Sequence, residues 1–148
     1  MAAVPMFSST AARTRTDTHD AAKLLLRLVL GVLILVHGIG KIGAGPGMIM
    51  DTVAKAGLPA AFAYLVYVGE VVAPLLLIVG LWTRVAALII AINMIVAVLL
   101  VHTGQLLQLS KSGGYALELQ AIYLFTAIAV AMLGAGRFSL GGRNGYLN

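Results

Sequence analysis

The amino-acid sequence predicts an all-α fold, an integral membrane four-helix bundle with both termini in the cytoplasm. The 148-residue chain is 61% hydrophobic and only 10% charged, whereas a soluble domain has about 25% charged residues. Its mean hydropathy is +1.02. Four apolar segments, each about long enough to cross a bilayer as a helix, account for this excess. Because only short connections remain between these segments, we expect a single transmembrane domain.

The charge and cysteine content exclude several classes of function. The formal net charge is +5, but the ten lysines and arginines are scattered along the chain, which excludes a nucleic-acid partner. The chain has no cysteine, which rules out disulfides, thiol redox chemistry and iron–sulfur clusters held by thiolates. Electron transfer would therefore require a bound cofactor or a quinone.

The first span, Leu24–Lys41, combines an apolar helix with ionisable residues. Residues 1–20, which precede it, are small and polar, and we expect a flexible cytoplasmic tail there. The span carries Arg27 near one end, and His37 and Lys41 near the other. Such groups are costly in hydrocarbon and need partners on other helices or a wet cavity. The apolar run is longer than the core of a signal peptide, so we expect it to be retained.

A short helix is expected between the first two spans. Glycines and Pro46 break the chain after the first span, and Met48–Ala56 then has apolar residues at helical spacing. We expect this segment to lie on the outer membrane surface as an interfacial helix. Residues 57–59, Gly-Leu-Pro, end it and restart the chain.

The second span, Ala60–Leu81, has a carboxylate near its middle, that of Glu70. Pro74 follows one turn later, and a proline at that depth kinks the helix and frees the carbonyl of the preceding turn, that of Glu70. Trp82 and Arg84 are expected to form an interfacial turn at the end of the span.

The last two spans carry fewer charged residues. The third span, Val85–His102, has Asn93 in its middle, and a polar, flexible loop is expected over Thr103–Gly114. The fourth span, Tyr115–Leu133, has Glu118 near its start. With four spans and short turns, the expected arrangement is an up-down-up-down bundle.

The transmembrane domain is expected to cover residues 21–140, with cytoplasmic tails at 1–20 and 141–148. With the N-terminus inside, the inner segments hold more basic residues than the outer ones, as the positive-inside rule requires. The inner basic residues are Arg13, Arg15, Lys23, Arg84, Arg137 and Arg143, and the outer ones are Lys41, Lys55 and Lys111.

Depth along the helices, at about 1.5 Å per residue, predicts two pairings. Glu70 lies near the bilayer centre and Arg27 toward the inner leaflet, so we expect a structural ion pair between them. His37 and Lys41 lie at the outer end of the first helix, so one of them is expected to pair with Glu118. As an alternative, the arginine reaches the inner surface and leaves Glu70 neutral. In a functional role, Glu70 is instead a proton-accepting or ligand-binding carboxylate.

Five ionisable residues form the candidate ligand-binding site. Imidazole, ammonium and carboxylate groups near the outer face can bind the oxygens of a quinone, with histidine as the proton carrier. No two ligands with metal-site spacing lie on one helix, so no metal site is predicted, and no catalytic residue is assigned. The tyrosines at 64, 67, 115 and 123 either line this site or mark the membrane interface. The candidate residues are His37, Lys41, Glu70, His102 and Glu118.

Several short motifs follow one another along the chain in a characteristic order. They are Arg27, Gly31, His37-Gly38-x-x-Lys41, residues 57–59, Glu70, residues 80–84 (Gly-Leu-Trp-Thr-Arg), Glu118 and residues 134–140 (Gly-Ala-Gly-Arg-Phe-Ser-Leu). Together they resemble the DoxX family of small four-helix membrane proteins, over residues 24–140. The chain departs from the family at Gly141, where an aspartate is usual, so the resemblance carries no role for an acid in this tail.

The resemblance implies a multi-pass protein of the bacterial or archaeal cytoplasmic (inner) membrane. The family is named for small subunits associated with quinol oxidase and thiosulfate:quinone oxidoreductase in archaea, and related bacterial proteins are linked to oxidative-stress and thiol-stress defence. Membrane oxidoreductase or oxidase subunits are therefore the implied partners, beside the lipid bilayer itself. The family-like polar residues are Arg27, His37, Lys41, Glu70, Arg84 and Glu118, and the resemblance assigns no chemistry to any of them.

Three hypotheses for function follow. The leading one is an inner-membrane accessory protein of redox or respiratory function that binds a quinone-like ligand in a polar pocket on the outer side of the bundle. The alternative is a non-enzymatic assembly subunit or membrane chaperone, in which the polar cluster only ties the helices together. The third is a small transporter that acts as a homo-oligomer, which few polar residues support. The ligand, any catalytic activity and the oligomeric state stay open.

Overall fold

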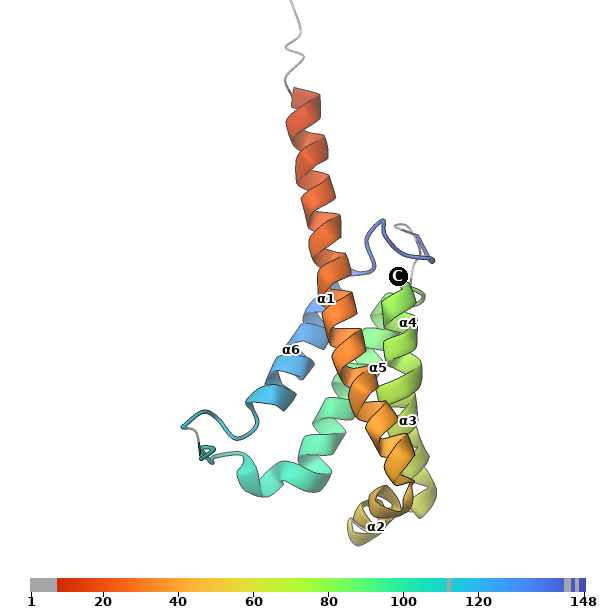
Figure 1. Ribbon diagram of the computed structural model, residues 1–148, viewed down its shortest axis with the longest axis vertical. Coiled ribbons are helices and arrows are strands. Elements are labelled where there is room, and N and C mark those ends of the chain that lie inside the picture. The colour runs from red at the N-terminus through yellow and green to blue at the C-terminus, as the bar shows by residue number, and fades with distance from the viewer. Residues whose placement is uncertain (1–7, 112, 143–144, 146) are drawn as a thin grey trace, which may run out of the picture.

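The computed structural model describes residues 8–111, 113–142, 145 and 147–148, and this part of the chain is helical throughout its regular structure (Figure 1). The only pairing of extended backbone within it is an isolated bridge between Leu109 and Tyr115. Three helical segments are long and apolar enough to cross a membrane, and a shorter fourth helix completes the bundle. The predicted fold, an all-α four-helix membrane bundle, is therefore confirmed.

The first span belongs to α1 (Ser8–Ala44), which is much longer than the span itself. The expected flexible tail over 1–20 is thus replaced by helix from residue 8 onward, while residues 1–7 lie outside the described part. A contact with the far end of the chain holds this extension: Arg137 lies 2.5 Å from Asp17 in an ion pair. The helix therefore extends well beyond the first span, and the flexibility of the tail stays a prediction.

The connection between the first two spans contains the expected short helix, α2 (Gly47–Lys55). It buries Val53 and packs against the start of the second span, the 3₁₀ turn η1 (Ala60–Tyr64). In Figure 1, α2 lies across the end of the bundle at which α1 terminates.

The second span is not one regular helix. After η1 it continues as α3 (Leu65–Tyr67), a π-helical turn η2 (Val68–Val72) and α4 (Ala73–Val79). Pro74 explains the wide turn, because a proline has no N–H to donate to the carbonyl one turn earlier and crowds it. The predicted distortion at Glu70 is therefore present, and π-turns of this kind are frequent at functional sites.

The third span is α5 (Thr83–Ala97) with its extensions η3 (Val98–His102), a π-turn, and η4 (Thr103–Gln105). The fourth helix is α6 (Glu118–Leu133), which begins later than the predicted Tyr115. Backbone hydrogen bonds explain the difference, because the amide of Ala116 donates to the carbonyl of Gln108 and holds this stretch in a hairpin.

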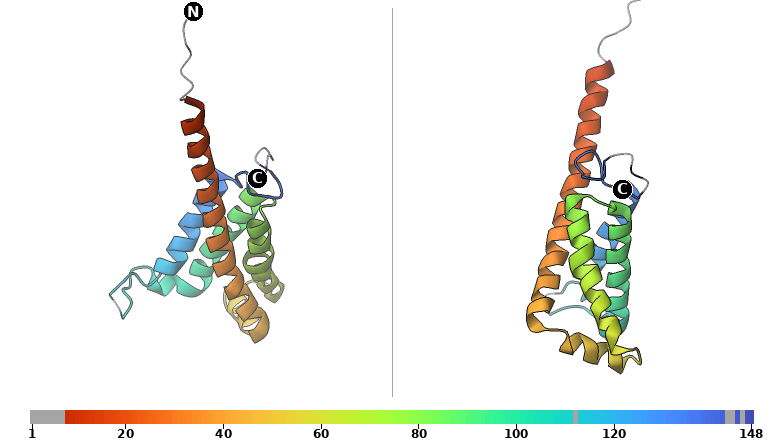
Figure 2. Two further views of the ribbon diagram at one scale, coloured as in Figure 1. Left: turned by 45° about the horizontal axis from the view of Figure 1, so that its top comes forward. Right: turned by 90° about the vertical axis from the view of Figure 1, so that its right-hand side faces the viewer.

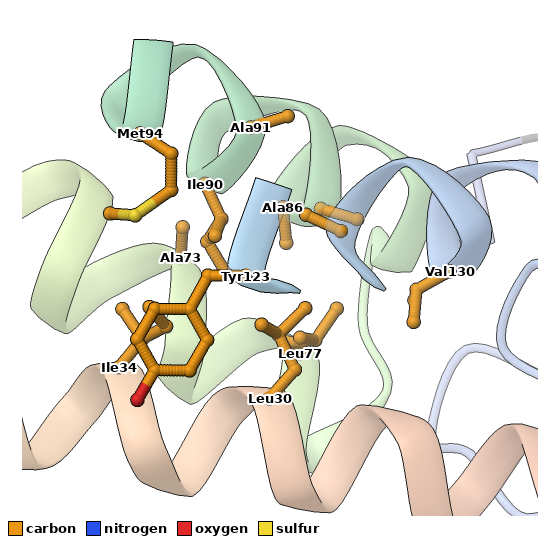
Figure 3. Packing of buried hydrophobic residues seen from close by; sticks show 12 residues of the cluster. Leu30, Ile34, Ala73, Leu77, Ala86, Ile90, Ala91, Met94, Tyr123 and Val130 are labelled. Atoms are coloured by element: carbon orange, nitrogen blue, oxygen red, sulfur yellow. The ribbon is translucent and has the colours of Figure 1, made fainter. Parts of the chain in front are cut away.

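The core lies where the four helices meet, with α1 against α4 and α5 against α6 (Figure 3). Alanines at the centre let the helices approach closely, and larger apolar side chains fill the remaining space. The buried cluster is Leu30, Ile34, Ala73, Leu77, Ala86, Ala87, Ile90, Ala91, Met94, Tyr123, Ala127 and Val130. Many large apolar side chains face outward instead, such as Phe125, as a lipid-facing surface requires.

The start of α1 and the segment after α6 lie toward the same end of the bundle (Figure 2). An even number of crossings requires this arrangement. The assignment of that end to the cytoplasm stays a prediction from the distribution of basic residues.

Candidate functional site

A cavity of about 170 Å³ opens between α1, the π-turn η2, α5 and α6. It combines an apolar wall with titratable and hydrogen-bonding groups, which is the usual composition of a small-molecule site. His37 and Leu119 on its rim are exposed, so the cavity is open to the side of the bundle. The lining residues are Ile34, His37, Lys41, Glu70, Met94, Ala97, His102, Leu119, Gln120 and Tyr123.

Glu70 is the central polar group of this cavity. Its carboxylate is almost completely buried, and the Nζ of Lys41 lies 2.5 Å from its Oε1. The side-chain amide of Asn93 donates a second hydrogen bond, of 3.2 Å, to the same oxygen. The other oxygen, Oε2, is buried without a hydrogen-bond partner among the described residues. One oxygen of Glu70 therefore joins the second span to both α1 and α5, while the second oxygen has no partner among the described residues.

Two glycines bring the backbone close enough for these contacts. A Cβ atom at Gly38 of α1 would overlap the carbonyl of Glu70, and a Cβ atom at Gly69 would overlap the side chain of Asn93. Glycine is thus required at both positions if α1, η2 and α5 are to meet at this depth.

His37 and Tyr123 form a second polar pair in the cavity. Their rings lie edge to face, with centroids 5.9 Å apart and an angle of 74°. The hydroxyl of Tyr123 lies 3.5 Å from the Nε2 of His37, and Figure 3 shows this hydroxyl pointing toward α1. The pair can therefore present an imidazole nitrogen and a phenol oxygen to a bound molecule.

His102 lines the cavity from the far end of α5. Its Nδ1 lies 3.1 Å from the Oε1 of Gln105, three residues later. Gln120, on the first turn of α6, lies on the same cavity and adds an amide. Of the five residues predicted as the ligand-binding cluster, the structure thus brings together His37, Lys41, Glu70 and His102.

Glu118 does not join this cluster among the described residues that line the cavity. It is exposed, and its carboxylate lies against the backbone of Gly114. The predicted pairing of Glu118 with His37 or Lys41 is therefore wrong. The reason is the late start of α6, which places Glu118 at the exposed first position of the helix rather than one turn inside it.

The predicted ion pair between Arg27 and Glu70 is also wrong. Lys41 takes the carboxylate, and Arg27 lies fourteen residues earlier on α1, a rise of about 21 Å. Arg27 is buried and donates instead to three backbone carbonyls, at 2.6 Å to Ala135, 3.0 Å to Phe138 and 3.4 Å to Ile78. Its guanidinium therefore fastens the end of α4 and the segment after α6 to α1.

The predicted interfacial residues Trp82 and Arg84 lie at the turn between α4 and α5. Trp82 adopts a left-handed backbone conformation with φ of 49° and is half exposed. The Nε of Arg84 donates to the carbonyl of Asn148 at 3.0 Å. This turn is therefore fastened to the last residues of the chain, at the same end of the bundle as Arg27.

Sequence reasoning placed Asn93 in the middle of a span but gave it no role at the site. An amide at that depth needs a partner, as the carboxylate does, and this requirement was the available signal. Gln120 gave no comparable signal, because a polar residue close to a helix start is ordinary. The part of the chain that the structure describes holds no group of three His, Asp or Glu side chains placed to bind a metal ion.

Comparisons with known proteins agree with this architecture. A sequence model of a protein family, described as DoxX, matches residues 22–103. A protein of Bacillus subtilis (strain 168), named "Putative oxidoreductase CatD", is 31% identical over 107 residues, which cover 72% of this chain and 79% of that protein. No solved structure matches the chain.

Proposed function

Since this chain belongs to the DoxX family, we propose that it is an accessory protein of redox function in a membrane, which binds a quinone-like ring in the cavity between α1, η2, α5 and α6. The single observation that carries this proposal is that one cavity, with an apolar wall, brings together the Lys41–Glu70 ion pair and the His37–Tyr123 pair. An apolar cavity on which a few polar groups converge is the usual form of a small-molecule site. This composition favours a ligand over a purely structural role.

The lining of the cavity suits a small aromatic ligand with polar substituents. Ile34, Met94 and Leu119 offer apolar contacts to the faces of a ring. His37 and Tyr123 offer hydrogen-bonding groups to the polar substituents, and Lys41 and Gln120 line the same cavity. Because the cavity opens to the side of the bundle among lipid-facing helices, a ligand dissolved in the bilayer reaches it without crossing water.

The accessory role follows from the chemistry that the chain lacks. Without a cysteine in its sequence, the chain has no thiol to oxidise and no thiolate to hold an iron–sulfur cluster. The related protein from Bacillus subtilis carries the name of an oxidoreductase. We therefore place the electron donor or acceptor in a partner, a membrane oxidoreductase or oxidase subunit, and place the chain in a bacterial or archaeal cytoplasmic membrane.

The first test is purification of the full-length chain in a mild detergent, followed by mass spectrometry of co-purifying small molecules and proteins. Binding of duroquinone and of its reduced form, duroquinol, to the same preparation is then measured by equilibrium dialysis without oxygen. We expect at least one form to bind, and His37→Ala to weaken this binding by about tenfold, the loss expected for a hydrogen bond together with its neighbouring contacts.

The matched control is His19→Ala, the same substitution on the same helix. His19 is exposed and lies eighteen residues before His37, about 27 Å along α1, so binding should not change. If neither form of the ring binds, or if the two alanine variants behave alike, the proposed ligand-binding function is wrong.

An assembly subunit is the second candidate function, and Arg27 is the observation that favours it. Among the described residues, the hydrogen bonds of this buried cation all fasten segments of the chain together, and in this second role Lys41 and Glu70 serve in the same way. In that case a protein partner co-purifies in fixed stoichiometry without a bound ring. Glu70→Gln then lowers the unfolding temperature and the yield of the complex, with no change in any ligand affinity.

A further inference from the structure

The two members of the Lys41–Glu70 ion pair differ in how far a ligand can reach them. Both residues line the cavity, but the side chain of Lys41 is 41% exposed and that of Glu70 only 4%. Oε1 of Glu70 is occupied by the ammonium of Lys41 and the amide of Asn93, and Oε2 is buried. A molecule in the cavity therefore meets the lysine of this pair rather than the carboxylate.

The ammonium of Lys41 keeps donors that the described part of the chain does not use. An ammonium carries three N–H groups, and the described residues give its Nζ one acceptor, Oε1 of Glu70. The imidazole of His37 lies toward the hydroxyl of Tyr123 instead. Gln120 lines the same cavity, but its amide is neutral and both donates and accepts. Lys41 is therefore the charged donor that the cavity offers to a ligand.

We propose that an acceptor oxygen of the bound ring contacts the ammonium of Lys41, and that Glu70 is a positioning residue that holds this ammonium from the buried side. This proposal rests on the proposed function and deepens it, because it assigns the polar contact that orients the ring. A hydrogen bond from an ionised donor is roughly twice as strong as one between neutral groups. Carbonyl and hydroxyl oxygens both accept hydrogen bonds, so the contact requires an oxygen on the ring but does not distinguish the oxidised from the reduced form.

The first test compares duroquinone with durene, which has the same ring and the same four methyl groups but no oxygen. Equilibrium dialysis of the full-length chain in a mild detergent, against protein-free micelles, gives both affinities. We expect duroquinone to bind at least about tenfold more tightly, as a hydrogen bond from a charged donor predicts. Equal affinities would overturn the proposal and leave a ring-binding cavity in place. If neither compound binds, the proposed function fails and this proposal with it.

Lys41→Met identifies the donor, because methionine keeps an unbranched side chain but has no N–H group. We expect the preference for duroquinone over durene to be lost in Lys41→Met and largely kept in Lys41→Arg, which retains a cation. The matched control is Lys55→Met, at an exposed lysine on α2, which should keep the full preference. If Lys41→Met keeps the preference, or if Gln120→Leu abolishes it instead, the proposal is wrong.

Glu70→Gln tests the positioning role. The amide oxygen still accepts from Lys41, but without a charge it holds the ammonium less firmly. We expect the affinity for duroquinone to fall and that for durene to stay the same. A purely structural loss of the cavity would lower both affinities together. An unchanged ratio of the two affinities, or an equal fall in both, would overturn the positioning role of Glu70.

A measurement on the unaltered chain keeps the proposal testable if the variants at Lys41 do not fold. N-acetoxysuccinimide acetylates lysine amines that are free to react, and mass spectrometry of peptides gives the rate at each lysine. With both compounds at saturating concentration, we expect duroquinone to slow acetylation of Lys41 more than durene does, and neither compound to affect Lys55. Equal slowing by the two compounds, or none, would show that the oxygen of the ring does not contact Lys41.

Discussion

Lys41, three residues before the end of α1, lies 2.5 Å from the buried carboxylate of Glu70 in the π-turn of the second span. The side chain of Lys41 is 41% exposed, whereas that of Glu70 is buried. The pair joins the first two spans at the level of the cavity. Lys41, near the predicted membrane boundary, is therefore the cation that pairs with Glu70. Arg27, deeper in the same helix, is not.

Removing the cation should leave Glu70 as a buried charge without compensation. We expect Lys41→Met to lower the free energy of unfolding by about 2 kcal/mol, less than for a fully buried pair because Lys41 is partly solvated. Lys41→Arg, which keeps the charge, should lose much less. Thermal unfolding in detergent, followed by the fluorescence of Trp82, measures both variants.

The double variant Lys41→Met with Glu70→Gln isolates the interaction itself. Because neither charge is then present, its stability should exceed the sum expected from the two single variants. Additive losses would show that the ion pair contributes nothing beyond the packing of the two side chains.

Gly38 should be far more sensitive to substitution than Gly40, two residues later on the same helix. A Cβ atom at Gly38 would overlap the carbonyl of Glu70, whereas at Gly40 nothing lies within 4 Å. Overpacking of this kind costs about 2 kcal/mol, so Gly38→Ala should lower the unfolding temperature and weaken any binding in the cavity. Gly40→Ala, the control, should be neutral or slightly stabilising because alanine favours helix. Equal effects of the two variants would contradict the close approach of α1 to η2.

The hydropathy of the sequence was sufficient to predict the spans and the short helix between them, because burial in lipid leaves a continuous apolar signal. The pairing of the charges was not predictable in the same way. Helical rise alone treats the two spans as starting at one level, but η1 packs against α2 and Glu70 pairs with Lys41 near the end of α1. This offset brings Glu70 level with Lys41 instead of Arg27. The register between helices depends on the contacts of Gly38 and Gly69, which no single-helix pattern encodes.

Arg27 should be essential for stability and irrelevant to the cavity. It donates to carbonyls of two segments at once, to Ile78 at the end of α4 and to Ala135 and Phe138 after α6, and a lysine has no planar fork with which to do so. We expect both Arg27→Lys and Arg27→Met to lower the free energy of unfolding, by about 2 kcal/mol or more for the methionine. Because the site lies about 21 Å away along α1, the affinity of the folded protein for duroquinol should not change. A variant that keeps its unfolding temperature but loses ligand would contradict this assignment.

The orientation of the bundle can be tested directly because the chain has no native cysteine. Lys55→Cys on α2 should react in intact cells with a maleimide that does not cross membranes. Leu140→Cys, which is also well exposed in the structure, should react only after the membrane is opened, since the positive-inside rule places that end in the cytoplasm. The reverse pattern of labelling would invert the predicted topology and place the cavity near the inner leaflet.

The shortness of α6 leads to a further expectation about the hairpin before it. Sixteen residues give a helix of about 24 Å, less than the roughly 30 Å of the hydrocarbon core. The inner end of α6 is fixed by the hydrogen bond from Arg27 to Ala135, so the deficit falls at the outer end. The hairpin should therefore dip into the outer leaflet, and its most exposed apolar residues, Leu107 at 99% and Leu109 at 73%, should contact lipid.

A nitroxide attached at Leu107→Cys in liposomes measures this depth through its collisions with oxygen, which is enriched in lipid, and with a water-soluble nickel complex. We expect the lipid pattern at Leu107 and the water pattern at Lys55→Cys, the control on α2. The distinction matters for the site, because the hairpin leads directly into the helix that carries Leu119 and Gln120. If the label at Leu107 lies in water, the bilayer must instead be thinned around α6, and a ligand would then meet the cavity from the aqueous side.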